Sequence, residues 1–418
     1  MAIVSLKHLV PFALLGLTSA TSVSYATDEF EQFKQQHLGE AAQYQQAQED
    51  EFKAYLKAYR QAFSEYKKEL AEVWGNDIAV SDETTWVTHS DDLTTRNEVD
   101  FEQEEIRVTL VVDADLPDDK IKVKLTEELT KIADTSVNQA QLEDPISQRV
   151  QKIVEPKALT PKLPPEYKPD LKPVIQIIEK PVNTRDGKKE IEKLVQTAKV
   201  EIKPAPTPVQ TTKPKAKQTK TTKNKHRIVI TVPMSKTAIS SKAERFKQPI
   251  TNSASKWKID DALVTAVIHT ESSFNPMARS HIPAYGLMQI VPRSAGQDAS
   301  ALIYGNARML TANYLYTPAK NINVGAAYLH ILNSRYLRKI ENPESRLYCM
   351  IAAYNTGAGN VARAFTGTTS VTKAARKINS MTPFQVYNHL LRNLPHKETK
   401  DYLERVSSRY EAYKKGTL

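Results

Sequence analysis

The stretch ESSFNPMARSHIPAYGLMQI, residues 271–290, decides how the C-terminal part of the chain is interpreted. It follows an apolar run over 260–273 that predicts a helix, which Asp260 can cap. Glu271 falls at the C-terminal end of that helix, because Asn275-Pro276 cannot continue it. The helix dipole favours cations at that end, so local helix physics does not explain a carboxylate there.

A glutamate near a helix end is, taken alone, most often a solvated surface residue. An apolar site, however, raises the pKa of a carboxyl group and keeps it protonated near neutral pH. That is the protonation state that a general acid needs. The sequence therefore makes Glu271 a candidate proton donor, and the residues around it must distinguish a general acid from a solvated surface residue.

Four short motifs surround this glutamate in order along the chain. They are Glu271-Ser-Ser-Phe-Asn-Pro276, Gly286-Leu-Met-Gln-Ile290, Ala353-Tyr-Asn355 and Glu398-Thr-Lys-Asp-Tyr402. Each is weak alone, but together they resemble the soluble-lytic-transglycosylase domain, a lysozyme-like α fold that cuts peptidoglycan. The resemblance covers roughly residues 237 to 415. It departs from the family pattern at Lys400, where arginine is usual, which weakens any bidentate contact at that position.

The resemblance implies a role for each matching residue. Glu271 is expected to be the catalytic acid and base, which protonates the glycosidic oxygen after N-acetylmuramic acid and then accepts the proton of the muramoyl C6 hydroxyl. That hydroxyl closes a 1,6-anhydro ring, so one carboxylate serves twice, and no metal or other cofactor is expected. The expected substrate-binding residues are Ser280, Met288, Gln289, Tyr354, Asn355, Glu398 and Tyr402.

Two other functions remain open at this point. A hydrolytic muramidase would need a second carboxylate, for which Glu398 or Asp401 could fold back toward Glu271. A non-catalytic peptidoglycan-binding protein could keep the fold without the chemistry. Simple packing would also account for Met288 and for Tyr354.

The charge of the chain is distributed unevenly. The 418 residues carry a net charge of +10, yet residues 27–130 hold 26 acids and 11 bases. Residues 131–236 hold 22 bases and 11 acids, and residues 237–418 hold 24 bases and 11 acids. This asymmetry indicates segments with different partners, and a basic domain favours a polyanion. We expect peptidoglycan glycan strands as the partner and no nucleic acid.

Residues 1–26 have the pattern of a secretory signal peptide. Lys7 precedes the apolar residues 9–17, and Ser24-Tyr25-Ala26 fits a cleavage site. The only cysteine is Cys349, in an apolar run typical of a buried position, so none lies near residue 26 to take up a lipid. We therefore expect a periplasmic protein, exported by the signal peptide and at most peripheral to the outer membrane.

Residues 27–154 predict a small acidic α+β domain. A helix over 30–74 carries an aromatic-rich face made of Phe52, Tyr55, Leu56, Tyr59, Phe63, Tyr66, Leu70 and Trp74. Alternation over 96–101 and 106–112 predicts an antiparallel strand pair with one buried face, and a helix is expected over 122–134. The domain resembles the N-terminal domain of a membrane-bound member of the same family.

The rest of the chain gives a mostly α fold. Frequent prolines and seven lysines within 203–226 predict a basic linker over 155–226, with a short helix near 188–200, which could contact anionic wall or membrane. A strand within 227–236 is expected to return to the first sheet. The lytic transglycosylase domain is expected over 237–418, with helices at 239–256, 260–273, 285–297, 319–338, 344–356, 358–365, 370–380, 383–392 and 398–413.

Overall fold

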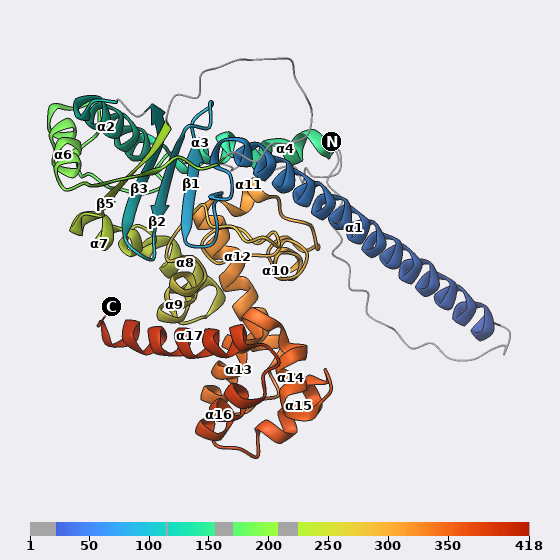
Figure 1. The fold of residues 1–418 in the computed structure, drawn as a ribbon. Coiled ribbons are helices and arrows are strands. Elements are labelled where there is room, and N and C mark those ends of the chain that lie inside the picture. Colours follow the sequence, from blue (N-terminus) through green and yellow to red (C-terminus); the bar gives the residue numbers. More distant parts are fainter. Residues whose placement is uncertain (1–21, 114–115, 155–169, 208–224, 418) are drawn as a thin grey trace. The chain divides into compact units, whose positions relative to one another are not determined.

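The computed structural model describes residues 22–113, 116–154, 170–207 and 225–417. The fold is mostly helical with one antiparallel sheet (Figure 1). The chain divides into two compact units, residues 1–50 and residues 51–418. Within the described part of the first unit, the chain is helical from Ser22 onward. The expected signal peptide lies mostly outside the described residues.

The sheet has five strands in the order β1-β2-β3-β5-β4, and every neighbouring pair is antiparallel. The strands are β1 Thr85–His89, β2 Thr95–Asp100, β3 Glu105–Asp113, β4 Lys199–Pro204 and β5 Lys225–Pro233. The predicted pair corresponds to β2 and β3, and the strand expected within 227–236 is β5, which lies beside β3.

The N-terminal helices are α1 Ser22–Trp74, α2 Asp118–Asp134, α3 Val137–Glu143, α4 Pro145–Ile153 and α6 Arg185–Gln196. They cover both faces of the sheet, which explains why β2 is buried from Thr95 to Val99 rather than on one face as expected. On one face, Arg96 lies 4.5 Å over the Trp74 ring at the end of α1. On the other, Asn97 donates a hydrogen bond of 2.6 Å to Glu128 on α2.

The linker expectation differs from the structure over residues 170–207. The short helix expected near 188–200 is confirmed by α6, but this part also contains β4, and Val174, Ile175, Ile177 and Ile178 are buried. The physical reason is that these aliphatic residues, with Ile191 and Leu194 of α6, bury enough apolar surface to offset the cost of ordering the chain. Residues 155–169 and 208–224 lie outside the described part of the chain.

The C-terminal half is helical. Its helices are α7 Lys236–Glu244, α8 Lys247–Trp257, α9 Asp261–Ser272, α10 Ala295–Tyr304, α11 Ala312–Leu315, α12 Pro318–Ile331, the π-helix η1 Leu332–Tyr336, α13 Pro343–Thr356, α14 Ala358–Thr366, α15 Val371–Ile378, α16 Pro383–Asn393 and α17 Lys397–Lys415. The helix expected over 239–256 is divided into α7 and α8 near Arg245.

The helix expected over 285–297 was wrong. Residues 273–294 form an irregular loop, and the helix begins only at Ala295. Within the loop, Tyr285 pairs with Ile290, and the backbone between them turns through positive φ at Gly286 and at Gln289. A side chain at Gly286 would meet the Leu315 carbonyl at 2.4 Å, so the turn requires glycine. Apolar spacing alone does not reveal such a turn.

The five strands with α1, α2, α3, α4, α6 and the described segments between them make up the sheet-containing module. Its side chains pack directly on this loop. The Tyr59 hydroxyl donates a hydrogen bond of 2.9 Å to the Ser280 carbonyl, and the Tyr55 hydroxyl bonds that of Tyr285. Arg279 forms a buried ion pair with Asp144, the residue that caps α4. These contacts join α1, α4 and the loop in one continuous apolar core.

None of the helices in the part of the chain that the structure describes has the length and apolarity of a membrane span. Cys349 is fully buried in α13, as its apolar surroundings in the sequence indicated.

Candidate active site

Glu271 lies in the last turn of α9, as the sequence predicted. The Asp260 side chain caps the start of this helix by accepting from the Ala262 amide at 2.9 Å. The helix ends because Ser273 and Phe274 both have positive φ, at 49° and 69°. Phe274 is buried and stacks on Phe246, so apolar packing holds the chain in this strained turn. The turn fixes the position of Glu271.

The carboxyl group of Glu271 is surrounded by protein, although part of the residue remains accessible. Burial raises the pKa of Glu271 to about 8, and the charge of Glu398 acts in the same direction. The Tyr402 hydroxyl and the charge of Arg405 oppose this shift in pKa. The carboxyl is therefore mainly protonated at neutral pH, which is the form that donates a proton.

Two tyrosines lie beside Glu271, of which Tyr402 is buried and Tyr354 is partly buried. Burial raises the pKa of Tyr354 and of Tyr402 well above the usual range, and the charge of Glu271 adds to both shifts. The Tyr354 hydroxyl donates a hydrogen bond of 2.8 Å to the Met288 carbonyl. The Tyr402 hydroxyl interacts with Glu271 but has no hydrogen bond of good geometry among the described residues. It is thus a buried hydroxyl placed to donate to the carboxylate form of Glu271.

The loop that carries Met288 and Gln289 is held by Asn321 on α12. The Asn321 side chain donates 2.7 Å hydrogen bonds to the carbonyls of Tyr285 and Leu315, and it accepts from the Met288 amide at 2.8 Å. The Met288 side chain has no exposed surface and packs on Gly325, so it supports the site from within the core instead of lining it as expected.

The Gln289 side chain is only partly buried. Its Nε2 donates to the Gly286 carbonyl at 2.9 Å, and its Oε1 has no hydrogen-bond partner among the described residues. An unsatisfied buried carbonyl oxygen costs free energy unless water or a ligand donates to it. Gln289 therefore keeps the acceptor that the expected contact with a sugar hydroxyl would use.

Asn355 and Glu398 meet at the end of α13 and the start of α17. The Asn355 amide donates to Glu398 at 3.5 Å, and the Thr399 hydroxyl donates to the Asn355 carbonyl oxygen at 2.7 Å. Glu398 is exposed, and its charge reaches both Glu271 and Glu83. Asp401 instead pairs with Lys397 on the same helix at 2.6 Å.

Ser280 lies in the loop beyond α9, and its hydroxyl donates to the Ile282 carbonyl. The Ser280 hydroxyl also accepts from the Ala284 amide at 3.3 Å. In the structure the Ser280 hydroxyl therefore closes a turn. Ser280 itself is partly exposed. The Lys400 side chain donates to the Arg392 carbonyl at 2.9 Å, a contact that needs one amine and no guanidinium.

Sequence reasoning missed Glu83, which precedes β1. Burial raises the pKa of Glu83, and its charge also acts on Glu271. Its backbone carbonyl accepts from the Asn275 side chain at 3.4 Å, which ties this segment to the end of α9. No local motif marks Glu83, because only the packing of the sheet-containing module on the loop brings it to this position.

Comparison with known protein families shows which domain the region around Glu271 resembles. The family described as the transglycosylase SLT domain matches residues 248–377, which include α9, the loop after it and α13. Residues 248–377 form an SLT domain. The motif that contains Glu398 and Tyr402 follows the matched residues directly, on α17.

The chain is also similar to curated proteins. It is 40% identical over 186 residues to membrane-bound lytic murein transglycosylase C of Salmonella arizonae, which is 44% of this chain and 51% of that protein. The same figures hold for the Klebsiella pneumoniae protein of that name. The protein of that name from Histophilus somni is 40% identical over 185 residues. The alignments thus span about half the length of the curated relatives.

Two solved structures resemble part of the chain. One is an inactive mutant of the lytic transglycosylase Slt from Pseudomonas aeruginosa, with 23% identity, a TM-score of 0.32, and coverage of 43% of this chain and 25% of that one. The other is the 70-kDa soluble lytic transglycosylase of Escherichia coli, with 23% identity, a TM-score of 0.31, and coverage of 41% and 24%.

Proposed function

We propose that this protein is a peptidoglycan lytic transglycosylase. It cleaves the β-1,4 bond between N-acetylmuramic acid and N-acetylglucosamine and leaves 1,6-anhydromuramic acid ends, in remodelling or turnover of the cell wall. The observation that carries the proposal is the state of Glu271, whose pKa burial raises to about 8. The SLT domain around it and the similarity to lytic murein transglycosylases support the same function.

In the proposed reaction, Glu271 first gives its proton to the glycosidic oxygen, and the bond from that oxygen to muramoyl C1 breaks. The resulting carboxylate then takes the proton of the muramoyl C6 hydroxyl, whose oxygen bonds to C1. The proton returns to Glu271, so the enzyme ends as it began and no water is consumed. The Tyr402 hydroxyl favours the carboxylate form of Glu271, since its interaction lowers the pKa of that group.

We propose that the polar groups around Glu271 bind the glycan. Gln289 offers its unsatisfied oxygen, Tyr402 offers its hydroxyl, and Asn355 with Glu398 offers a polar pair at the start of α17. Ser280 presents its turn on the side of the sheet-containing module. Met288 acts through its backbone, which positions Tyr354.

A hydrolytic muramidase is the second candidate function. The observation that favours it is that two further carboxylates, Glu398 and Glu83, are close enough to Glu271 for their charges to raise its pKa. A hydrolase needs a second carboxylate to activate water or to form a covalent intermediate. Asp401 is a poorer candidate, because its partner is Lys397.

The mass of the products separates these functions. Peptidoglycan digested by the full-length protein should give soluble fragments whose muramoyl ends are one water lighter than reducing ends. Glu271→Gln should give none of them while it still binds the polymer. Reducing ends would establish a hydrolase, and binding without any product from the wild type would favour a binding protein.

We further propose that the protein acts in the cell envelope after export, with an N-terminal signal peptide, an acidic sheet-containing module and the catalytic domain as its parts. The similarity to membrane-bound envelope enzymes supports this location. The lysine-rich residues 203–226 lie mostly outside the described part, and contact with anionic wall or membrane is proposed for them from their charge alone. Deletion of these residues with unchanged sedimentation on cell envelopes would contradict that contact.

A further inference from the structure

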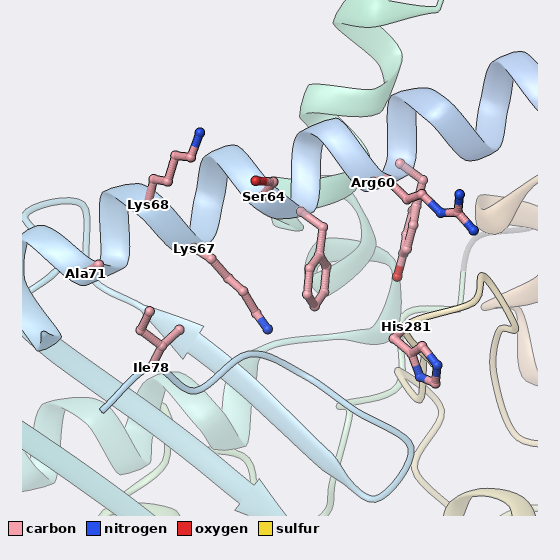
Figure 2. A pocket seen from close by; sticks show the side chains of 9 residues that line it. Arg60, Ser64, Lys67, Lys68, Ala71, Ile78 and His281 are labelled. Atoms are coloured by element: carbon pink, nitrogen blue, oxygen red, sulfur yellow. The ribbon is translucent and has the colours of Figure 1, made fainter. Parts of the chain in front are cut away.

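A second surface feature lies close to the proposed active site, on the face of α1 that meets the SLT domain loop. It is a pocket of about 440 Å³. The residues that line it include Tyr59, Arg60, Phe63 and Lys67 of α1 and His281 of the loop after α9. Figure 2 shows Arg60 and Lys67 on the helix, with His281 coming from a different segment of the chain. None of the substrate-binding residues proposed above belongs to it. The pocket therefore needs an explanation of its own.

The chemistry of the pocket is cationic and apolar together. The Lys67 amine lies 4.7 Å from the centroid of the Phe63 ring. This amine forms no ion pair among the described residues. Arg60 likewise has no carboxylate partner within the described part of the chain, although acids outnumber bases over residues 27–130. Figure 2 shows Lys67 extending toward the side where Ile78 and His281 lie, whereas Lys68 extends away. Cationic side chains without an ion-pair partner, next to an aromatic ring, favour a ligand that has both a carboxylate and an apolar part.

The pocket is connected to the proposed active site through one turn of the chain. His281 follows Ser280, whose carbonyl accepts from the Tyr59 hydroxyl at 2.9 Å. The charge of His281 also acts on Glu83, and Glu83 in turn acts on Glu271. A polymer bound at Glu271 would therefore carry its nearby substituents toward this pocket.

We propose that this pocket binds a carboxylate-bearing peptide stem of the peptidoglycan strand whose glycan occupies the site at Glu271. This inference rests on the proposed function. In peptidoglycan the lactyl carboxyl of a muramoyl unit is joined to a short peptide by an amide bond, so the free carboxylates of a peptide-bearing strand reside mainly on the peptides. Lys67 and Arg60 pair with those carboxylates, and Phe63 with Ile78 packs against the aliphatic side chains. An anionic lipid headgroup shares the charge but does not share the position beside the glycan site.

The test compares glycan strands that carry peptides with strands from which an amidase has removed them, which leaves a lactyl carboxylate on each muramoyl sugar but none at the distance of the peptide. Lys67→Glu should lower the affinity for peptide-bearing strands by roughly three- to tenfold, because one ion pair becomes a repulsion. Its affinity for peptide-free strands should stay within twofold of the wild type. Lys57→Glu is the matched control, since Lys57 is an exposed lysine of the same helix that does not line the pocket. Lys67→Arg should restore most of the affinity.

Binding and turnover are measured separately, so the two proposals can fail separately. A wild type that binds peptide-bearing strands more tightly but yields no anhydro product would contradict the proposed function alone. Equal loss of affinity for both kinds of strand in Lys67→Glu, or none for either, would overturn the peptide site. Loss of binding only to vesicles that contain phosphatidylglycerol would overturn it in favour of a lipid surface.

Discussion

The substitution Glu271→Gln should stabilise the fold, and the gain should depend on pH. In the folded protein the pKa of Glu271 is raised from 4.5 to about 8, with burial as the main cause. Between these two values the folded state binds more protons than the unfolded state, so the free energy of unfolding falls as pH rises. The slope is at most ~1.4 kcal/mol per pH unit for one group. Glutamine has a similar shape and does not titrate.

The magnitude follows from the span of pH that is crossed. From pH 4.5 to pH 7 the wild type would lose ~3 kcal/mol of stability relative to Glu271→Gln if the carboxyl were fully shielded from water. Because part of the residue is accessible to water, the expected loss is ~2 kcal/mol. The difference should vanish near pH 4.5, where Glu271 is protonated in the folded protein and half-protonated in the unfolded chain. It should reach its full size near pH 8.

Urea unfolding of the full-length protein, followed by tryptophan fluorescence across this range of pH, measures the difference. Glu404→Gln is the control, because Glu404 is an exposed residue of α17 and its loss should leave the pH dependence unchanged. A Glu271→Gln gain that is the same at pH 4.5 and at pH 8 would refute the argument that burial holds the proton on this carboxyl.

Two further predictions concern the neighbours of Glu271 and the packing of the module. The alkaline limb of the rate profile should lie near pH 8, because activity needs protonated Glu271. Glu398→Gln should move this limb to lower pH, since a like charge that raises the pKa of Glu271 is lost. Tyr402→Phe should move the limb to higher pH, since an interaction that lowers the pKa of Glu271 is lost. Shifts of the same sign in initial-rate measurements would contradict this assignment. Arg279→Met should cost ~3–5 kcal/mol of stability, because it leaves Asp144 buried without its partner, and Arg279→Met with Asp144→Asn should recover part of that loss. A single-variant cost below ~1 kcal/mol in urea unfolding would show that the pair is solvated.

Sequence patterns predicted the elements whose signals are local. The spacing from Phe52 to Trp74 gave the buried face of α1, and the alternation near residue 106 gave β3, because both patterns follow the period of their own element. The end of α9 was predictable because Pro276 stops a helix wherever it occurs. The four motifs located Glu271 because each is a short stretch that can be recognised in the sequence without knowledge of the fold.

Other parts depended on residues far apart in the chain. Residues 285–297 were expected to be helical from their apolar spacing, but Asn321 on α12 holds the loop there through the Tyr285 carbonyl and the Met288 amide. The segment that contains α6 looked like a linker because its prolines are frequent, yet Ile175 and Ile177 are buried in the core. Glu83 reaches the site only because the sheet-containing module packs on the SLT domain. No local pattern encodes such contacts.

Digestion of peptidoglycan in water enriched in oxygen-18 tests the central claim most directly. If the muramoyl C6 hydroxyl is the acceptor and Glu271 serves as both acid and base, mass spectrometry should find anhydromuramoyl ends without the heavy isotope. One oxygen-18 at each new reducing end would mean that water is the acceptor. That result would contradict the account and direct attention to Glu398 and Glu83 as the second carboxylate.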